Sequence, residues 1–170
     1  MTPGSVPRAV VSSLPCCDGE RVLAGARDVH RRWHVGTDAA AYFANDEGYE
    51  RNAWEDLEQA TWDADDSQLV VTGIADFGEP QPQWALEFDE PGRFLELVRE
   101  RITASVLLTV TVPLESRRKQ SVSVIVRRSP TRSGELGFSF RLDDGLDPED
   151  PQVREAAREG LAQARDQLGL

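Results

Sequence analysis

Three aspartates and a serine occur within five positions of the stretch TWDADDSQLVV, at residues 61–71. A dense group of carboxylates can bind a calcium ion, because calcium prefers oxygen ligands. A calcium loop beginning at Asp63 would need glycine at its sixth position and glutamate at its twelfth, but Gln68 and Ile74 occupy these positions. Aspartate and serine also hydrogen-bond their own backbone in turns. The segment therefore predicts a hairpin turn between two strands.

A second arrangement that could do chemistry combines cysteine with histidine. Cys17 is followed by His30 and His34 at the spacing of the second half of a zinc finger, so these three residues form a weak metal candidate. The first half of the finger is missing, because Cys16 and Cys17 are adjacent instead of being separated by the two to four residues that a finger needs. We therefore expect no metal site, no disulfide framework and no cofactor.

Motifs typical of catalysis are missing from the sequence. It has two histidines, and it contains no glycine-rich phosphate loop, no nucleophile elbow and no grouping of histidine with carboxylates. Pairs of carboxylates such as Asp143 and Asp144 lie in turn contexts, where aspartate is favoured for backbone reasons. We therefore expect a protein that is not an enzyme, with an enzyme that uses carboxylates as an alternative.

Charge is distributed unevenly along the 170 residues, whose net charge is −11. Residues 41–92 contain fourteen acidic residues and one base, Arg51. Residues 116–132 contain six bases and no acidic residue, and they form the first candidate site for an anion or a nucleic acid. These bases are Arg117, Arg118, Lys119, Arg127, Arg128 and Arg132.

Hydrophobic periodicity predicts an α+β fold. In WALEF, at residues 84–88, large apolar side chains alternate with Ala85 and Glu87, as in a half-buried strand. Seven candidate strands precede residue 90, namely RVLAGAR, RWHVGT, AAYFA, ERNAW, EQATW, QLVVTGI and WALEF. Turn-forming residues separate them. The period then becomes helical from about residue 91 to 103, with Phe94, Val98 and Ile102 on one face.

Seven short strands followed by one helix is the element order of the pleckstrin-homology superfold. Residues 19–104 resemble a bacterial pleckstrin-homology-like domain, which implies a seven-stranded antiparallel barrel closed by a helix, after a flexible tail at residues 1–18. The segments GTDAAAYF, AWEDLEQATWDADDSQLVV and RFLELVRERITASV also resemble an uncharacterised family of small actinobacterial proteins, which implies no activity.

The same resemblance supplies a second anion candidate. Pleckstrin domains that bind phosphoinositides carry their bases in the loop that joins the first two strands, and the matching residues here are Arg27, His30, Arg31 and Arg32. The acidic character of the surrounding module opposes binding to an anionic membrane.

Residues 105–170 predict a different module. VLLTVTVPL, SVSVIVRR and GFSFRL alternate as strands and predict a three-stranded antiparallel meander, while Asp150 and Pro151 begin a helix that extends to about residue 168. Helix, three strands and helix is also the order of a double-stranded RNA-binding domain. The second helix of such a domain begins with lysines, whereas here it begins with DPEDPQVRE, so we infer only a shared topology.

These patterns favour an interaction module over an enzyme. We expect a cytoplasmic adaptor without membrane insertion that binds an unknown basic or amphipathic protein partner through its acidic face. The alternative is binding of a nucleic acid or a phosphorylated ligand by the basic hairpin 116–132. The opposite charges of the two modules also predict that residues 105–170 pack on the first module.

Overall fold

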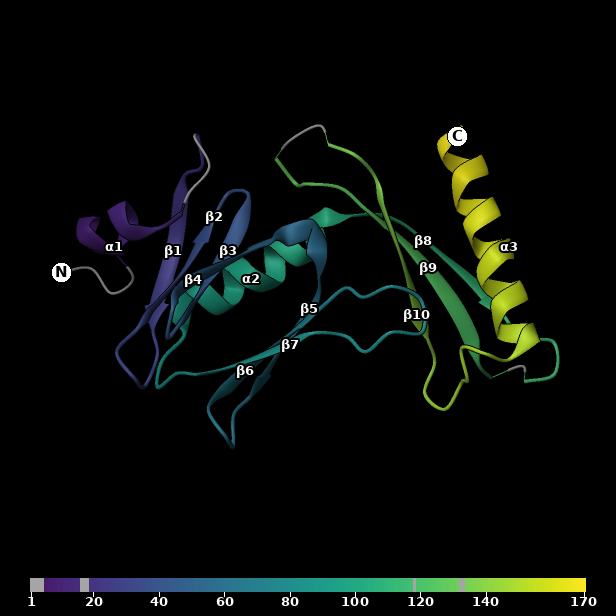
Figure 1. Ribbon diagram of the computed structural model, residues 1–170, viewed down its shortest axis with the longest axis horizontal. Helices are drawn as coiled ribbons and strands as arrows, with labels where there is room; N and C mark the ends of the chain where they lie inside the picture. Colours follow the sequence, from purple (N-terminus) through teal and green to yellow (C-terminus); the bar gives the residue numbers. More distant parts are fainter. Residues whose placement is uncertain (1–4, 16–18, 118, 132–133) are drawn as a thin grey trace. The chain divides into compact units, whose positions relative to one another are not determined.

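The chain forms two units. The computed structural model describes residues 5–15, 19–117, 119–131 and 134–170 (Figure 1). Unit 1 comprises Met1–Gly73, Pro82–Ser105 and Ser129–Ser133, and unit 2 comprises Ile74–Gln81, Val106–Arg128 and Gly134–Leu170. In the described part of the chain, no helix has both the length and the apolar character needed to cross a membrane.

Unit 1 contains two antiparallel sheets, and its seven strands are the seven that periodicity predicts. The first sheet has the order β1 (Val22–Arg27), β2 (Trp33–Thr37), β3 (Ala40–Asn45) and β4 (Gly48–Ala53). The second has the order β5 (Leu57–Asp63), β6 (Gln68–Gly73) and β7 (Gln83–Glu87). A short 3-10 helix, η1 (Trp54–Asp56), connects the two sheets.

The barrel that the sequence resemblance implies is not closed. Strand pairing is confined to each sheet, so the described strands form two separate sheets instead of one cylinder. A single backbone hydrogen bond of 3.0 Å, from Val29 N–H to the Glu87 carbonyl, joins the β1–β2 loop to β7. One bond of this kind does not make a strand ladder, and the expectation of a closed barrel is therefore wrong.

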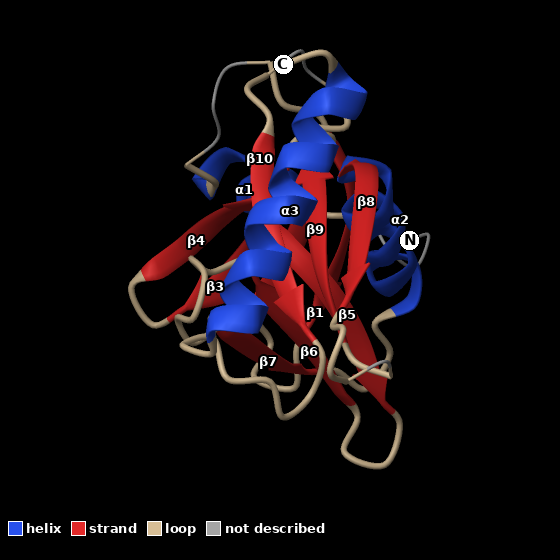
Figure 2. Cartoon of the chain, turned by 90° about the vertical axis from the view of Figure 1, so that its right-hand side faces the viewer, coloured by secondary structure: helices blue, strands red, loops and turns tan. Residues whose placement is uncertain are grey.

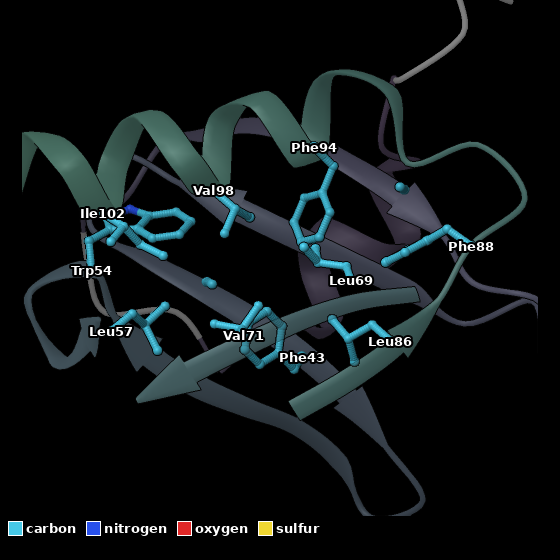
Figure 3. Packing of buried hydrophobic residues seen from close by; sticks show 12 residues of the cluster. Phe43, Trp54, Leu57, Leu69, Val71, Leu86, Phe88, Phe94, Val98 and Ile102 are labelled. Carbon is cyan, nitrogen blue, oxygen red and sulfur yellow. The ribbon is translucent and has the colours of Figure 1, made fainter. Parts of the chain in front are cut away.

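Helix α2 (Gly92–Ser105) fills the space that the two sheets leave open. The predicted apolar face is confirmed, because Phe94, Val98 and Ile102 are buried and point toward the strands (Figure 3). They contact apolar side chains from both sheets, including Phe43 and Leu69, in one core cluster. Burial of this face stabilises the helix more than its intrinsic propensity can.

Residues 8–13, expected to belong to a flexible tail, form the short helix α1 (Arg8–Ser13). Leu14, just after this helix, is buried in a small cluster with Val35 and Tyr42, and Val10 packs against the same cluster. The apolar pair at residues 10 and 11 is too short to reveal a period. Contact with the first sheet therefore orders a segment that looks like a tail in the sequence.

The hairpin turn predicted at residues 63–67 is confirmed. It joins β5 to β6, and the Asp63 Oδ1 atom accepts hydrogen bonds from the backbone N–H groups of Asp65 and Asp66 at 2.9 and 3.2 Å. Asp63 therefore satisfies the turn backbone with its own side chain.

Unit 2 consists of a three-stranded sheet covered by one long helix (Figure 2). Its strands are β8 (Val106–Pro113), β9 (Ser121–Arg127) and β10 (Gly137–Leu142), with β9 in the centre as predicted. Helix α3 (Pro151–Leu168) begins at the N-cap Asp150, whose carboxylate accepts a hydrogen bond from the Gln152 N–H, and ends at Gly169 in the left-handed conformation. Both caps follow standard helix chemistry.

Helix α3 lies close to the sheet because its contact face is made of small residues. Ala156, Ala157, Gly160 and Ala164 are buried on this face. A Cβ atom at Gly160 would lie 2.8 Å from a methyl carbon of Val124, so glycine permits the approach over β9. The helix contacts β8 and β9.

Candidate functional site

Helix α3 has two flanks of opposite charge on either side of its buried face. Gln152, Glu155 and Glu159 recur at helical spacing along one flank, and Arg154 and Arg158 recur along the other. Figure 2 shows α3 running over the sheet with the edge strand β8 on one side and the edge strand β10 on the other. Each flank borders a groove, and both grooves belong to unit 2.

The groove beside β8 is acidic, and we call it the acidic groove. It has a volume of about 220 Å³ and is open to solvent. Its walls are the end of β8 and the first two turns of α3, with the residues Val112, Pro113, Leu114, Glu115, Gln152, Glu155, Ala156 and Glu159. The side chains of Ser116 and Gln152 are hydrogen-bonded to each other. Three carboxylates thus border the groove, and none of its lining residues in the described part of the chain is basic.

The strand that forms one wall of the acidic groove is a sheet edge without charged residues. In β8, VLLTVTVP, every residue is apolar or threonine, and among the described strands only β9 pairs with it. Proteins usually protect a long edge strand with lysines, other charges or proline, because an unpaired edge recruits further strands. Pro113 supplies such protection only at the last residue of β8. The other edge strand of this sheet, β10, contains Arg141.

The groove beside β10 is aromatic and basic, and we call it the basic groove. It has a volume of about 320 Å³ and is lined by Phe77, Phe140, Arg154, Ala157, Arg158 and Leu161. The two phenylalanine rings meet edge to face, with centroids 5.4 Å apart. Phe77 comes from the β6–β7 loop, which belongs to unit 2.

A buried Asp–His pair in unit 1 contradicts the expectation that no histidine is grouped with a carboxylate, but neither ring nitrogen is available to act as a general base. The His34 ring is fully buried, and its Nε2 lies 3.0 Å from Asp28 Oδ2. Its other nitrogen, Nδ1, accepts a hydrogen bond from the backbone N–H of Ala44. Both ring nitrogens are therefore engaged, and a general base needs a free nitrogen within reach of a substrate. The pair holds the β1–β2 loop to the sheet.

The pKa values of His34 and Asp28 are both lowered, but for different reasons. Burial lowers the pKa of His34, and the Ala44 N–H favours the neutral ring with its proton on Nε2. Burial alone would raise the pKa of Asp28, but hydrogen bonds from His34 and Arg32 outweigh it and lower the pKa. The pair is therefore a neutral imidazole bonded to a carboxylate.

We expect the free energy of unfolding to fall as the pH drops below about 6.5. Unfolded His34 takes up a proton near that ordinary pKa, whereas the buried ring stays neutral to lower pH, so the unfolded state binds more protons there. The expected slope approaches about 1.4 kcal/mol per pH unit, and His34 contributes no slope above this range. Urea unfolding at a series of pH values measures this dependence of the free energy of unfolding on pH.

A His30→Gln variant leaves His34 as the only imidazole in the chain, because the sequence has two histidines. Imidazole nitrogen chemical shifts in this variant should show a neutral ring protonated on Nε2 and a pKa below 6.5. A pKa at or above that value, or a proton on Nδ1, would contradict the assignment.

The six bases of the first anion candidate do not form one surface in the described residues. Arg117 and Lys119 are exposed before β9, Arg128 is exposed after it, and the intervening strand spans roughly 20 Å. Arg127 is buried, with 3% of its surface exposed. Arg118 and Arg132 lie outside the described residues.

The second anion candidate is also divided. Arg32 bonds Asp28 through its Nε at 2.9 Å, while His30 and Arg31 are exposed in the β1–β2 loop. Arg27 lines an open cleft of about 550 Å³ together with Arg93, Asp89 and other residues. This cleft contains as many acidic as basic side chains, because Glu90 also lines it, so its charge does not favour an anion.

The metal candidate has no support in the described residues. No group of three or more potential ligands occurs among them. His34 is buried with both nitrogens engaged, His30 is exposed in a loop, and Cys17 lies outside the described residues. The Asp143 carboxylate, considered above for catalysis, instead accepts hydrogen bonds from the backbone N–H and hydroxyl of Ser121.

Comparison with known proteins gives no relative. No family model, curated protein or solved structure matches the chain. The resemblances to the pleckstrin-homology superfold and to small actinobacterial proteins stay predictions.

The sequence patterns predict neither groove. A partial signal exists, because QVREAAREG places glutamates and arginines on different flanks of a helix. Which residues lie beside the helix cannot be read from that segment, since β8 and the β6–β7 loop are distant in the sequence and the side of α3 on which β10 lies depends on the sheet.

Proposed function

We propose that this protein is a non-enzymatic interaction module that binds a basic, extended peptide segment of a protein partner in the acidic groove. The single observation that supports this most strongly is β8, an eight-residue edge strand without charged side chains. An extended peptide can add to such an edge as a further strand, with main-chain hydrogen bonds giving affinity.

Charge in the groove selects the partner. Glu115, Glu155 and Glu159 lie where alternate side chains of an added strand would point toward α3, so lysine or arginine fits at these positions. Glu155 is already paired with Arg158 at 3.2 Å, but both side chains are 72% exposed, and an exposed pair exchanges partners at little cost. The proposed acidic surface thus lies in unit 2 and not in residues 41–92.

The alternatives receive less support. Nucleic-acid binding by the basic hairpin needs bases on one surface, whereas the described bases lie at opposite ends of β9. Catalysis by carboxylates needs them held in fixed positions, whereas the three glutamates of the acidic groove are exposed side chains. The buried carboxylates of Asp28 and Glu20 are fully engaged in hydrogen bonds within unit 1.

We also propose that unit 1 is related to the pleckstrin-homology group. The support is its order of four strands, three strands and a helix, with α2 completing the core between the sheets. The proposed relation concerns the arrangement of strands and helix only, and it implies no ligand.

A short peptide of alternating lysine and threonine is expected to bind the full chain with an affinity that falls as salt is added, because the contacts are solvent-exposed ion pairs. Amide NMR signals of Thr109, Thr111 and Val112 should shift, since these residues lie on the edge that the peptide pairs with. A Glu115→Gln, Glu159→Gln variant should bind about tenfold more weakly, through the loss of two charge-assisted contacts.

Glu135→Gln is the matched control, because Glu135 is exposed just before β10 and does not line the acidic groove. A peptide in which glutamate replaces lysine should not bind. Equal binding to both charge variants, or NMR shifts confined to residues outside β8 and α3, would overturn the proposal.

A further inference from the structure

The basic groove combines two features that an amphipathic anion requires. Its floor is apolar and comes from Phe77, Phe140, Ala157 and Leu161, which three separate parts of the chain contribute. Arg154 and Arg158 border this floor from adjacent turns of α3. The cavity of about 320 Å³ is at the small end of the range of ligand pockets.

Arg154 and Arg158 each form an ion pair with an exposed glutamate, Glu149 and Glu155 respectively. Arg154 bonds Glu149 at 2.6 Å and the Pro148 carbonyl at 3.3 Å. These bonds use two of the five N–H donors that a guanidinium has. The Arg154–Glu149 side chains are 46% and 75% exposed, so the ion pair is screened by water and contributes little. A carboxylate that arrives with an apolar body can therefore bind an arginine without breaking a buried interaction.

We propose that the basic groove binds a small carboxylate with an aryl or medium-length acyl body. The apolar body lies on the Phe77 and Phe140 rings, and the carboxylate accepts hydrogen bonds from Arg154 and Arg158. Charge favours this occupant over a cation or a neutral lipid, because the charged residues that line the groove are two arginines, while their exposed partners Glu149 and Glu155 lie outside the lining. The two grooves share no lining residue, so the inference does not depend on the proposed function, although the exposed Arg158–Glu155 ion pair lies between them.

Decanoate is the probe, and decanol is its uncharged counterpart. Titration of the full chain with decanoate should shift the NMR signals of Phe77, Phe140 and Leu161, the apolar residues that line the groove. Decanol should bind about tenfold more weakly, because it cannot form the charge-assisted hydrogen bonds. Acetate, which keeps the carboxylate but lacks the apolar body, should not bind measurably.

Two variants and one control distinguish the charged contact of the site from its apolar contact. Arg158→Gln should weaken decanoate binding by about tenfold through the loss of one charged partner. Arg141→Gln is the matched control, because Arg141 is exposed on β10 and points to the opposite face from its neighbour Phe140. Phe77→Ser should weaken decanoate and decanol by the same factor, since it removes apolar contact alone.

Circular dichroism of each variant must first show an unchanged fold. Decanoate shifts that map elsewhere, equal affinity for decanol, or equal losses in Arg158→Gln and Arg141→Gln would each overturn the proposal. Binding of the lysine–threonine peptide should be unchanged in Phe77→Ser, so failure of this site is distinguishable from failure of the acidic groove.

Discussion

Trp54→Ala is expected to lower the free energy of unfolding of unit 1 by about 3–5 kcal/mol, the usual cost of deleting a buried tryptophan. Trp54 is 0% exposed and packs beside Leu57 and Ile102 in the core cluster (Figure 3). Its indole Nε1 also donates a 3.0 Å hydrogen bond to the Thr37 carbonyl. The substitution therefore leaves a large cavity and an acceptor without its donor.

Tryptophan fluorescence during urea unfolding provides the measurement. All four tryptophans, at positions 33, 54, 62 and 84, belong to unit 1, so their emission reports on this unit alone. Trp62→Ala is the matched control, because Trp62 is only partly buried at the margin of the same cluster and should cost less. Equal losses from the two substitutions would show that the packing described for Trp54 is wrong.

Glu20→Ala is expected to cost about 2–4 kcal/mol, slightly less than the loss of one partner from a fully buried ion pair. The Glu20 side chain is 0% exposed, and its carboxylate accepts hydrogen bonds from Arg51, Thr37 and Tyr42. Arg51 is 30% exposed, so water reaches its charge after Glu20 is removed and moderates the cost. The carboxylate holds the segment before β1 against three strands of the first sheet.

The ionisation of Glu20 determines the pH at which its contribution to stability should be measured. Burial by itself would raise its pKa, but hydrogen bonds from Arg51, Thr37 and Tyr42 outweigh burial and lower the pKa below 4.5. The contribution of the carboxylate should therefore be complete at neutral pH and decline as the pH falls below about 4.5. Urea unfolding at pH 7 compares Glu20→Ala with wild type.

Glu20→Gln keeps the size of the side chain and two acceptor lone pairs but removes the charge. Its free energy of unfolding should therefore lie between the values for wild type and for Glu20→Ala. Glu47→Ala, at an exposed turn position, is the control and should change stability by less than about 0.5 kcal/mol. Similar values for Glu20→Ala and Glu47→Ala would show that the buried network is not formed.

The sequence by itself determined the ten strands and the two long helices that the structure describes, because each of them is encoded by neighbouring residues. Helix α1 is the exception, since contact with the first sheet orders it. The alternation in GFSFRL and WALEF, the cap formed by Asp150 and Pro151, and the turn at Asp63 are local chemistry, and all of them occur as predicted. The apolar spacing of Phe94, Val98 and Ile102 likewise identified the buried face of α2.

Only the tertiary structure decided whether the sheets close, which charges are free and where the grooves lie. Glu20 and Arg51 form an ion pair although they are 31 positions apart, and residues 28 and 34 pair because the β1–β2 loop folds back on itself. Arg127 counts as an exposed base in a charge pattern, yet it is buried in the central strand β9. Periodicity describes one segment at a time, whereas the charge of a surface depends on which segments become neighbours when apolar area is removed from water.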